Sequence, residues 1–160
     1  TNKIGALVAL NDIQSPVRET ALAQFYTAFK DEPLVVNKWL TLQASSILPN
    51  TLDRVIELTQ HEAFDIKNPN NVYALICAFG ANHAVMHTEQ ARAYTFIADQ
   101  VLALDAFNPQ VAARVLTPLT RWRQWDKSRG TLMREQLLRI QQAPNLSSDV
   151  FEMVEKSTVL

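Results

Sequence analysis

Cysteine and glycine are scarce in this chain of 160 residues, and each scarcity excludes a class of protein. Cys77 is the only cysteine, so no internal disulfide can form, and a reducing compartment such as the cytoplasm fits this composition. Cys77 stands in the apolar run 75–79, where we expect a buried and unreactive thiol. Three glycines are too few for the turns of an all-β fold.

Long apolar runs are also missing. No run approaches the ~20 residues of a membrane-spanning helix, and no basic segment followed by an apolar one marks a secretory leader. We therefore expect no membrane span. The chain begins with Thr1 rather than Met, and we expect it to be a piece of a longer protein. Its 48% of apolar and 19% of charged residues are typical of a globular domain with a real core.

Apolar residues recur at helical spacing along the whole chain, and no segment has a convincing strand pattern. The spacing predicts about nine helices, most of them opened by a proline or a capping residue. They are expected to begin near residues 4, 16, 33, 51, 69, 88, 109, 126 and 147. We also predict a loop over 60–68, a helix end at Gly80, and an interruption at Pro118 in a helical segment that runs from Pro109 to about Trp125.

Asn68-Pro69 and Asn108-Pro109 are the clearest helix starts, and each leads into an apolar run. An Asn side chain accepts hydrogen bonds from the first turn, and a Pro in that turn has no N–H to leave unsatisfied. Helices in pairs joined by short links stack into a solenoid more readily than into a closed bundle. The predicted fold is therefore all-α, with about nine helices in antiparallel pairs forming an armadillo/HEAT-like superhelix, in a single domain over 1–160.

The residue pattern shows little sign of catalysis or metal binding. Residues 61–65 begin with His-Glu, but the zinc-protease motif needs a second His where this chain has Asp65. His83 and His87 are spaced i, i+4 without a third ligand in register, so we expect surface or capping histidines. The chain has no nucleophile elbow and no glycine-rich phosphate loop. We therefore predict no catalytic residue and no metal site.

Basic residues are concentrated between Arg114 and Arg139. This segment has seven Lys or Arg and two acidic residues, a net charge of +5 in a chain whose net charge is −1. Residues 121–125 interleave Arg with Trp, as a nucleic-acid surface can. The interpretation that we favour places the Trp side chains in the core and the Arg side chains on a solvated face. A free-standing helical scaffold that binds a partner protein or nucleic acid through the basic face 114–139 is the alternative function.

A long series of residues keeps the order and spacing of one known family. It comprises residues 64–72, 75–76, 78–79, Tyr94, Phe96, 98–99, 108–114, 118–119, Asp126, 133–134 and 145–147. In these residues the chain resembles the all-helical domain at the C-terminal end of bacterial aminopeptidase N, the zinc-dependent alanyl aminopeptidase. The match is strong in the last hundred residues and weaker in the first fifty.

The resemblance implies that this chain is the non-catalytic C-terminal domain of an enzyme that releases N-terminal amino acids from peptides. The catalytic zinc and its ligands would lie in an earlier domain that this chain does not contain. The partners would be the other domains of the same protein and its peptide substrates. In the family this domain caps the active site and walls the substrate cavity, and Gln110 and Arg114 match positions that face the cavity. A guanidinium there could bind a peptide carboxylate or carbonyl.

Tyr73 departs from the family pattern, because relatives resemble one another in carrying an Arg at this position. The resemblance thus implies that one cation is missing from the cavity wall of this variant. Two further departures are His61-Glu62, where His-Pro is usual, and residues 86–94, which replace a segment rich in Asp and Gly.

The two candidate functions predict different surfaces on the first helices. A domain severed from a larger protein should expose an apolar stripe of Ile4, Leu7, Val8 and Ile13 where the remainder packed. A free-standing scaffold should cover that stripe with polar residues. Glu and Lys are scarce in residues 4–17, which favours the severed domain.

Overall fold

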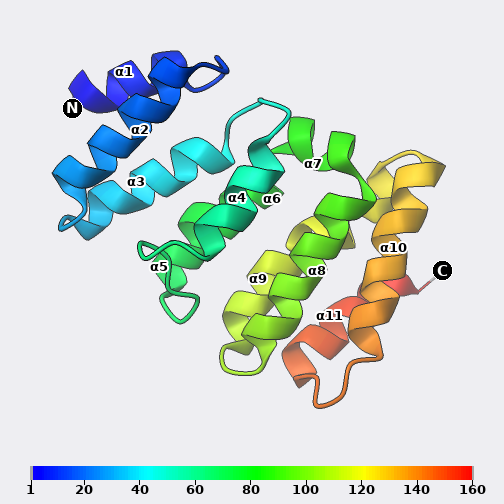
Figure 1. The fold of residues 1–160 in the computed structure, drawn as a ribbon. Helices are drawn as coiled ribbons and strands as arrows, with labels where there is room; N and C mark the ends of the chain where they lie inside the picture. Colours follow the sequence, from blue (N-terminus) through cyan, green and yellow to red (C-terminus); the bar gives the residue numbers. More distant parts are fainter. Residues whose placement is uncertain (1, 160) are drawn as a thin grey trace. The chain divides into compact units, whose positions relative to one another are not determined.

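The computed structural model describes residues 2–159, and its inter-residue contacts divide the chain into two compact units. The first unit ends at Val85 and the second begins at Met86, and each is described by itself below. No strand occurs among the described residues, so the all-α prediction is confirmed (Figure 1). The prediction of a single domain over 1–160 stays a prediction.

The first unit is built around α3. Its helices are α1 (Asn2–Leu10), α2 (Pro16–Phe29), α3 (Pro33–Ala44), α4 (Thr51–Thr59) and a last helix from Pro69 to Gly80. That last helix consists of α5 (Pro69–Val72), a π-helical turn η1 (Tyr73–Cys77) and α6 (Ala78–Gly80). α3 packs against α2, α4 and η1, and its Leu40 is fully buried. The Trp39 indole N–H donates to the Leu22 carbonyl at 3.0 Å, which ties α3 to α2.

The second unit is built from four helices, α8 to α11, that pack against one another. α8 (Ala91–Asp105) contacts α9 (Pro109–Thr120) and α10 (Lys127–Gln141), and α11 (Ser148–Thr158) contacts both α9 and α10. A short 3₁₀ turn, η2 (Trp122–Gln124), lies between α9 and α10 in the chain. The buried Asp105 carboxylate accepts hydrogen bonds from the amide and hydroxyl of Ser147, the residue that caps α11. The end of α8 thereby positions the start of α11.

Eight of the nine predicted helix starts lie within two residues of the observed ones, and the start predicted at residue 88 was wrong. Helix α7 (His83–Glu89) was not predicted, and residue 88, the expected start of the next helix, belongs to it. Gln90 separates α7 from α8 with φ 54° and ψ −119°, a conformation rare for a residue with a side chain. The residues of this region that usually mark turns, Gly80 and Asn82, lie before α7. At the break between α7 and α8 the chain has only Gln90, a residue type that does not indicate a turn.

Three local predictions can be compared with the structure. Residues 60–68 contain no helix and α6 ends at Gly80, as predicted. The helix opened by Pro109 continues through Pro118 without the predicted interruption and ends at Thr120, short of Trp125. Pro118 lies in the last turn, where its missing N–H removes one bond from an already ending helix. The expectation of a fully buried Cys77 was wrong, because this residue of η1 is only partly buried.

The apolar stripe predicted on the first helices is only partly exposed. Val8 and Ile13 are 56% and 53% exposed, and Ile4 is half-buried. Leu7, however, is buried, because α2 packs on α1 and covers it. The prediction for Leu7 was therefore wrong, and the exposed apolar side chains of this region extend instead to Val17 at the start of α2.

Two leucines of α3 provide a matched test of this packing. Leu40 is fully buried and Leu34 is 78% exposed. Leu40→Ala should lower the free energy of unfolding by about 2–5 kcal/mol, because it removes buried atoms and leaves a cavity. Leu34→Ala should lower it by less than about 0.5 kcal/mol. Urea unfolding followed by circular dichroism measures both, and equal losses would contradict the assignment of the two faces of α3.

Candidate functional site

The first turn of α9 presents two of the residues that the sequence singled out. The Asn108 side chain accepts a hydrogen bond from the Val111 amide at 3.2 Å, and Pro109 follows as the first helical residue. This start places Val111, Ala112 and Val115 on the buried face against α8 and α11. Gln110 and Arg114, one turn apart, fall on the opposite face and are exposed.

An amide and a guanidinium one helical turn apart can together bind an extended peptide. The Gln110 amide can donate to a carbonyl and accept from an N–H, whereas the Arg114 guanidinium only donates and suits a carbonyl or carboxylate. Because both side chains are exposed on a helix whose inner face is fixed by packing, their spacing is set by the backbone of α9. The α9 face is therefore suited to contact a polar chain.

Tyr73 occupies a different kind of position. It is the first residue of the π-helical turn η1 and is half-buried. Asn68 caps this helix by accepting from the amides of Asn70 and Asn71, at 3.0 and 3.4 Å. The Thr41 hydroxyl of α3 donates to the Ala74 carbonyl at 2.7 Å, which anchors the widened turn. Single π turns inside α-helices occur frequently at functional sites, and nothing in the sequence signalled this one.

The structure therefore brings together two of the three predicted site residues. Gln110 and Arg114 share one face of α9 in the second unit, whereas Tyr73 belongs to the first unit. Each residue lies on a helix with an Asn cap and a Pro in the first turn, as the sequence predicted.

The histidines serve as packing and hydrogen-bonding groups. Among residues 2–159 no group of three or more His, Cys, Asp or Glu side chains is placed to hold a metal ion. In the loop, His61 Nδ1 accepts from the Ala63 amide at 3.0 Å, and its ring meets Tyr26 edge-on with centroids 4.7 Å apart. The His61-Glu62 motif thus has a structural explanation.

His87 was expected at the surface or at a helix end, and the prediction of exposure was wrong. Its side chain is buried at the C-terminal end of α7 and stacks on Trp125, with ring centroids 3.5 Å apart. Its Nδ1 lies 2.7 Å from the hydroxyl of Tyr94, a residue with no exposed surface. Burial raises the pKa of Tyr94 to about 12, so this phenol stays protonated and available for the hydrogen bond.

Three arginines of the basic segment 114–139 have hydrogen-bond or ion-pair partners within the second unit. Arg123 donates to the carbonyls of Ser157 and Val159, Arg129 donates to the His87 carbonyl and to Asp126, and Arg139 pairs with Asp99. The hydrogen bonds from Arg129 lower the pKa of Asp126, which keeps that pair ionised.

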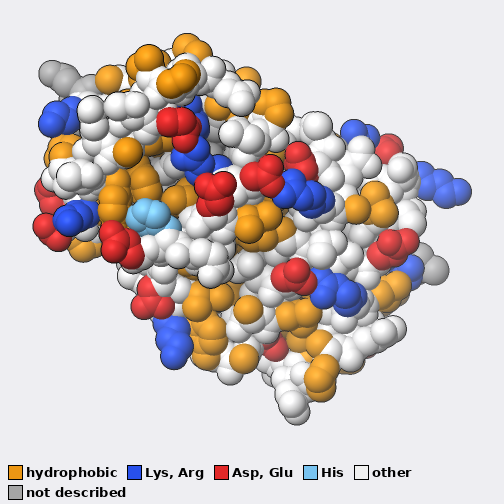
Figure 2. All heavy atoms as spheres, in the orientation of Figure 1, with side chains coloured by type: hydrophobic (Ala, Val, Ile, Leu, Met, Phe, Trp, Pro, Cys, Tyr) orange, Lys and Arg blue, Asp and Glu red, His pale blue; other side chains and the backbone are white. Residues whose placement is uncertain are grey.

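The tryptophans of this segment also have internal partners. The Trp122 indole donates to the Ser157 carbonyl at 3.0 Å, and Trp125 stacks on His87. On the face of the molecule in Figure 2, acidic and basic side chains are interspersed. These contacts favour the packing interpretation of the Arg-Trp segment over a stacking surface for nucleic-acid bases.

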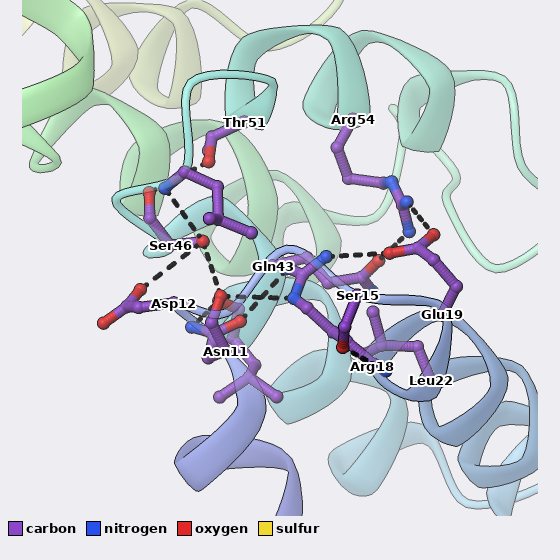
Figure 3. Close-up of polar contacts among 12 residues, drawn as sticks. Asn11, Asp12, Ser15, Arg18, Glu19, Leu22, Gln43, Ser46, Thr51 and Arg54 are labelled. Atoms are coloured by element: carbon purple, nitrogen blue, oxygen red, sulfur yellow. Dashed lines mark hydrogen bonds and ion pairs between the residues drawn. The ribbon is translucent and has the colours of Figure 1, made fainter.

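A polar network around the buried Arg18 in the first unit was missed by the sequence analysis (Figure 3). Arg18 of α2 donates from Nε to the Asn11 carbonyl at 3.1 Å and from Nη1 to Glu19 at 3.0 Å. Arg54 of α4 pairs with the other oxygen of Glu19 and donates to Gln43 of α3 at 3.1 Å. The signal was the position of Arg18, because it shares the buried stripe of α2 with Leu22 and Phe25.

Glu19 is the centre of this network, and its ionisation is tied to the two guanidiniums. Burial by itself would raise the pKa of Glu19, but the hydrogen bond and charge of Arg54, together with the charge of Arg18, outweigh it. The pKa of Glu19 therefore lies below its ordinary value of 4.5. For Arg18, by contrast, burial is the main cause of a lowered pKa, because burial disfavours the charged guanidinium.

Comparison with known proteins gives matches over almost the whole of this chain. A domain of unknown function with ARM repeats (DUF3458_C) matches residues 1–159. Aminopeptidase N of Caulobacter vibrioides is 43% identical and that of Escherichia coli K12 is 36% identical, each over 98% of this chain. The chain spans 18% of the length of these relatives. The crystal structure of Legionella pneumophila aminopeptidase A in complex with aspartic acid matches 95% of this chain and 18% of its own with a TM-score of 0.90 and 35% identity.

These matches confirm two expectations. The resemblance to the C-terminal helical domain of bacterial aminopeptidase N is confirmed. The ARM repeats of the family agree with the predicted armadillo-like fold.

Among the described residues, none of the helices combines the length and apolar character that a bilayer crossing requires.

The lowered pKa of Glu19 predicts a pH-dependent contribution to stability. The folded state binds the proton of this carboxyl less strongly than the unfolded chain. The contribution is therefore present above about pH 4.5 and is lost as the pH falls through the folded-state pKa. Glu19→Gln should flatten the fall in unfolding free energy between about pH 5 and pH 3, measured by urea unfolding. Glu135→Gln, an exposed change on α10, should leave that slope unchanged, and an unchanged slope in Glu19→Gln would contradict the pairing.

Proposed function

Since the chain belongs to the DUF3458_C family of ARM-repeat domains, we propose that it is the non-catalytic C-terminal domain of a zinc-dependent aminopeptidase. In this role it caps the active site of the parent enzyme and forms part of the wall of the cavity that receives peptides. The observation that carries the proposal is the match of 98% of this chain to proteins named aminopeptidase N. The parent enzyme would release N-terminal amino acids from peptides in the cytoplasm.

The zinc of the parent enzyme belongs, in this proposal, to a domain outside this chain. The histidines of this chain support a zinc site elsewhere in the enzyme. The His61-Glu62 segment is a loop, and His61 Nδ1 already accepts a hydrogen bond from a backbone amide. His87, the other histidine with a described ring nitrogen contact, bonds to Tyr94 in the interior. The chain would act on the reaction only through the shape and polarity of the cavity wall.

Gln110 and Arg114 are the proposed contacts with the peptide. Their exposure on one face of α9 supports this assignment, since a cavity wall needs polar side chains that reach the solvent. A guanidinium one turn along the helix from an amide would hold the distal part of a long peptide, away from the bond that is cut. Short substrates would not reach it.

Tyr73 is the proposed site of variation in this wall. The family resemblance implies a guanidinium at this position, and a phenol in its place would keep a hydrogen-bonding group but remove a positive charge. Its location at the start of the π turn supports a role for this position beyond packing. The charge that Arg114 supplies would then matter more in this variant.

The role of Arg114 can be tested in the full-length enzyme. Arg114→Ala should lower kcat/KM for a hexapeptide about tenfold, because it removes a charge-assisted hydrogen bond, and should change that for an alanyl p-nitroanilide by less than about twofold. Arg121→Ala, an equal loss of charge at an exposed position just after α9, is the matched control and should affect neither substrate. Equal losses for the long and short substrates would contradict the cavity role of Arg114.

Tyr73 offers the converse test. Tyr73→Arg in the full-length enzyme should lower KM for the hexapeptide severalfold, because it restores a cation to the wall, and should leave KM for the p-nitroanilide unchanged. Tyr73→Phe separates the charge from the loss of the phenol hydroxyl. A fall in KM for both substrates, or for neither, would remove Tyr73 from the peptide path.

The non-catalytic assignment has its own check. The isolated chain should release no alanine from an alanyl reporter in the presence of zinc. Turnover by this chain alone, abolished by a chelator, would overturn the proposed function.

A further inference from the structure

A pocket in the first unit is lined by Arg18, Glu19 and Arg54 together with polar and apolar neighbours. Its volume is about 650 Å³, and it lies between the first turns of α2 and the segment that leads into α4. Pockets of roughly 300–1,000 Å³ are typical of small-molecule sites. The function proposed above makes no use of this pocket.

The charges that line the pocket are unbalanced. Two guanidiniums, Arg18 and Arg54, face a single carboxylate, Glu19, so the lining has one positive charge in excess. Glu57 lies 3.9 Å from Arg54 Nε, but its side chain is 74% exposed, and solvent screens so exposed a pair. The Asp12 carboxylate accepts hydrogen bonds from the Ile47 amide and the Ser46 hydroxyl and is not among the lining residues.

The Arg18 side chain has more N–H donors than there are acceptors bonded to it. Its side chain is only 4% exposed and carries five N–H groups. Within residues 2–159 its acceptors are the Asn11 carbonyl, Asn11 Oδ1 at 3.3 Å and Glu19 Oε2. Nη1 and Nη2 each carry a second N–H beyond these bonds, which can donate to an acceptor in the pocket.

Two helix starts add to the positive character of the pocket. Ser15 caps α2 by accepting from the Arg18 amide, and Ser15 itself lines the pocket. Asn50 lines it from the start of α4, yet the Asn50 side chain accepts no hydrogen bond from the first turn of that helix. The N–H groups of a helix start attract negative charge. Figure 3 shows Arg54 reaching from α4 towards Glu19 on α2 in the same region.

We propose that this pocket binds a small organic carboxylate, held by the guanidiniums of Arg54 and Arg18, with its apolar body against Pro16 and Leu48. A single negative charge matches the excess of one positive charge in the lining. A phosphate group, with up to about two charges, would place a second negative charge beside Glu19. The volume exceeds that of a carboxylate group alone, which is why the ligand needs an apolar body.

The binding test uses this chain with matched probes, and it is independent of the enzyme activity proposed above. N-acetylalanine carries one carboxylate, and N-acetylalanine amide has the same body without the charge. By ¹⁵N NMR, N-acetylalanine should shift the Arg54 Nε–Hε signal and the amides of residues 50–53 saturably, and the amide should bind at least tenfold more weakly. Inorganic phosphate should also bind more weakly. Equal or tighter binding of the amide or of phosphate would overturn the proposal.

Two variants should change the affinity in opposite directions. Arg54→Gln should weaken binding of N-acetylalanine about tenfold, because it removes one of the two cations. Glu19→Gln should tighten it severalfold, because it removes the competing carboxylate and keeps a side chain of the same shape. Arg121→Gln, in the second unit, should leave the affinity unchanged.

The folded state of each variant is checked by circular dichroism before binding is measured. If Arg54→Gln does not fold, Glu19→Gln still decides the question, because an affinity that is unchanged or weaker in that variant would overturn the proposal.

Discussion

The register of each helix, fixed by its first residues, is the constraint on which the rest of this structure depends. In α9 the Asn108 cap and Pro109 set the start, and every later residue then has a fixed face. Val111 and Val115 turn inward, so Gln110 and Arg114 must turn outward. A cap shifted by one residue would rotate the helix by about 100° and would move the exposed pair towards the core. The candidate peptide-binding face is thus determined by the two residues before it.

The helix that follows Asn68 obeys the same rule only as far as Val72. The π turn over Tyr73–Cys77 inserts extra length, so residues after it face directions that an ideal helix would not give them. Leu75 and Ile76 remain fully buried, whereas Cys77 is left partly exposed. The Thr41 hydroxyl bonds to the Ala74 carbonyl inside the turn, which shows how α3 supports the irregular backbone. Tyr73 stands where the register changes, and its side-chain direction cannot be derived from the cap alone.

These cases define how much the sequence could predict. Caps, prolines and apolar spacing are local signals, and they gave the start of most helices and the outward pair on α9. Helix α7 was missed because its boundary is a strained Gln90 rather than a Gly, Pro or Asn. The burial of His87 depends on a stack with Trp125, nearly forty residues away in the sequence. Arg18 lies on the buried stripe of α2, but its acceptors on Asn11 come from the loop before that helix, and the periodicity of α2 does not show them.

Arg129 and Arg139 of the second unit differ from Arg18 and Arg54 of the first in how their carboxylate partners are shared. In the second unit Arg129 pairs with Asp126, and Arg139 pairs with Asp99, so each of these cations has its own carboxylate. In the first unit Arg18 and Arg54 share Glu19. Removing a cation from water is costly unless its charge and donors are met, and folding alone would favour one carboxylate for each arginine. Arg54 has one further carboxylate, Glu57, at 3.9 Å, but the Glu57 side chain is 74% exposed. The sharing of Glu19 beside a pocket agrees with the carboxylate site proposed above.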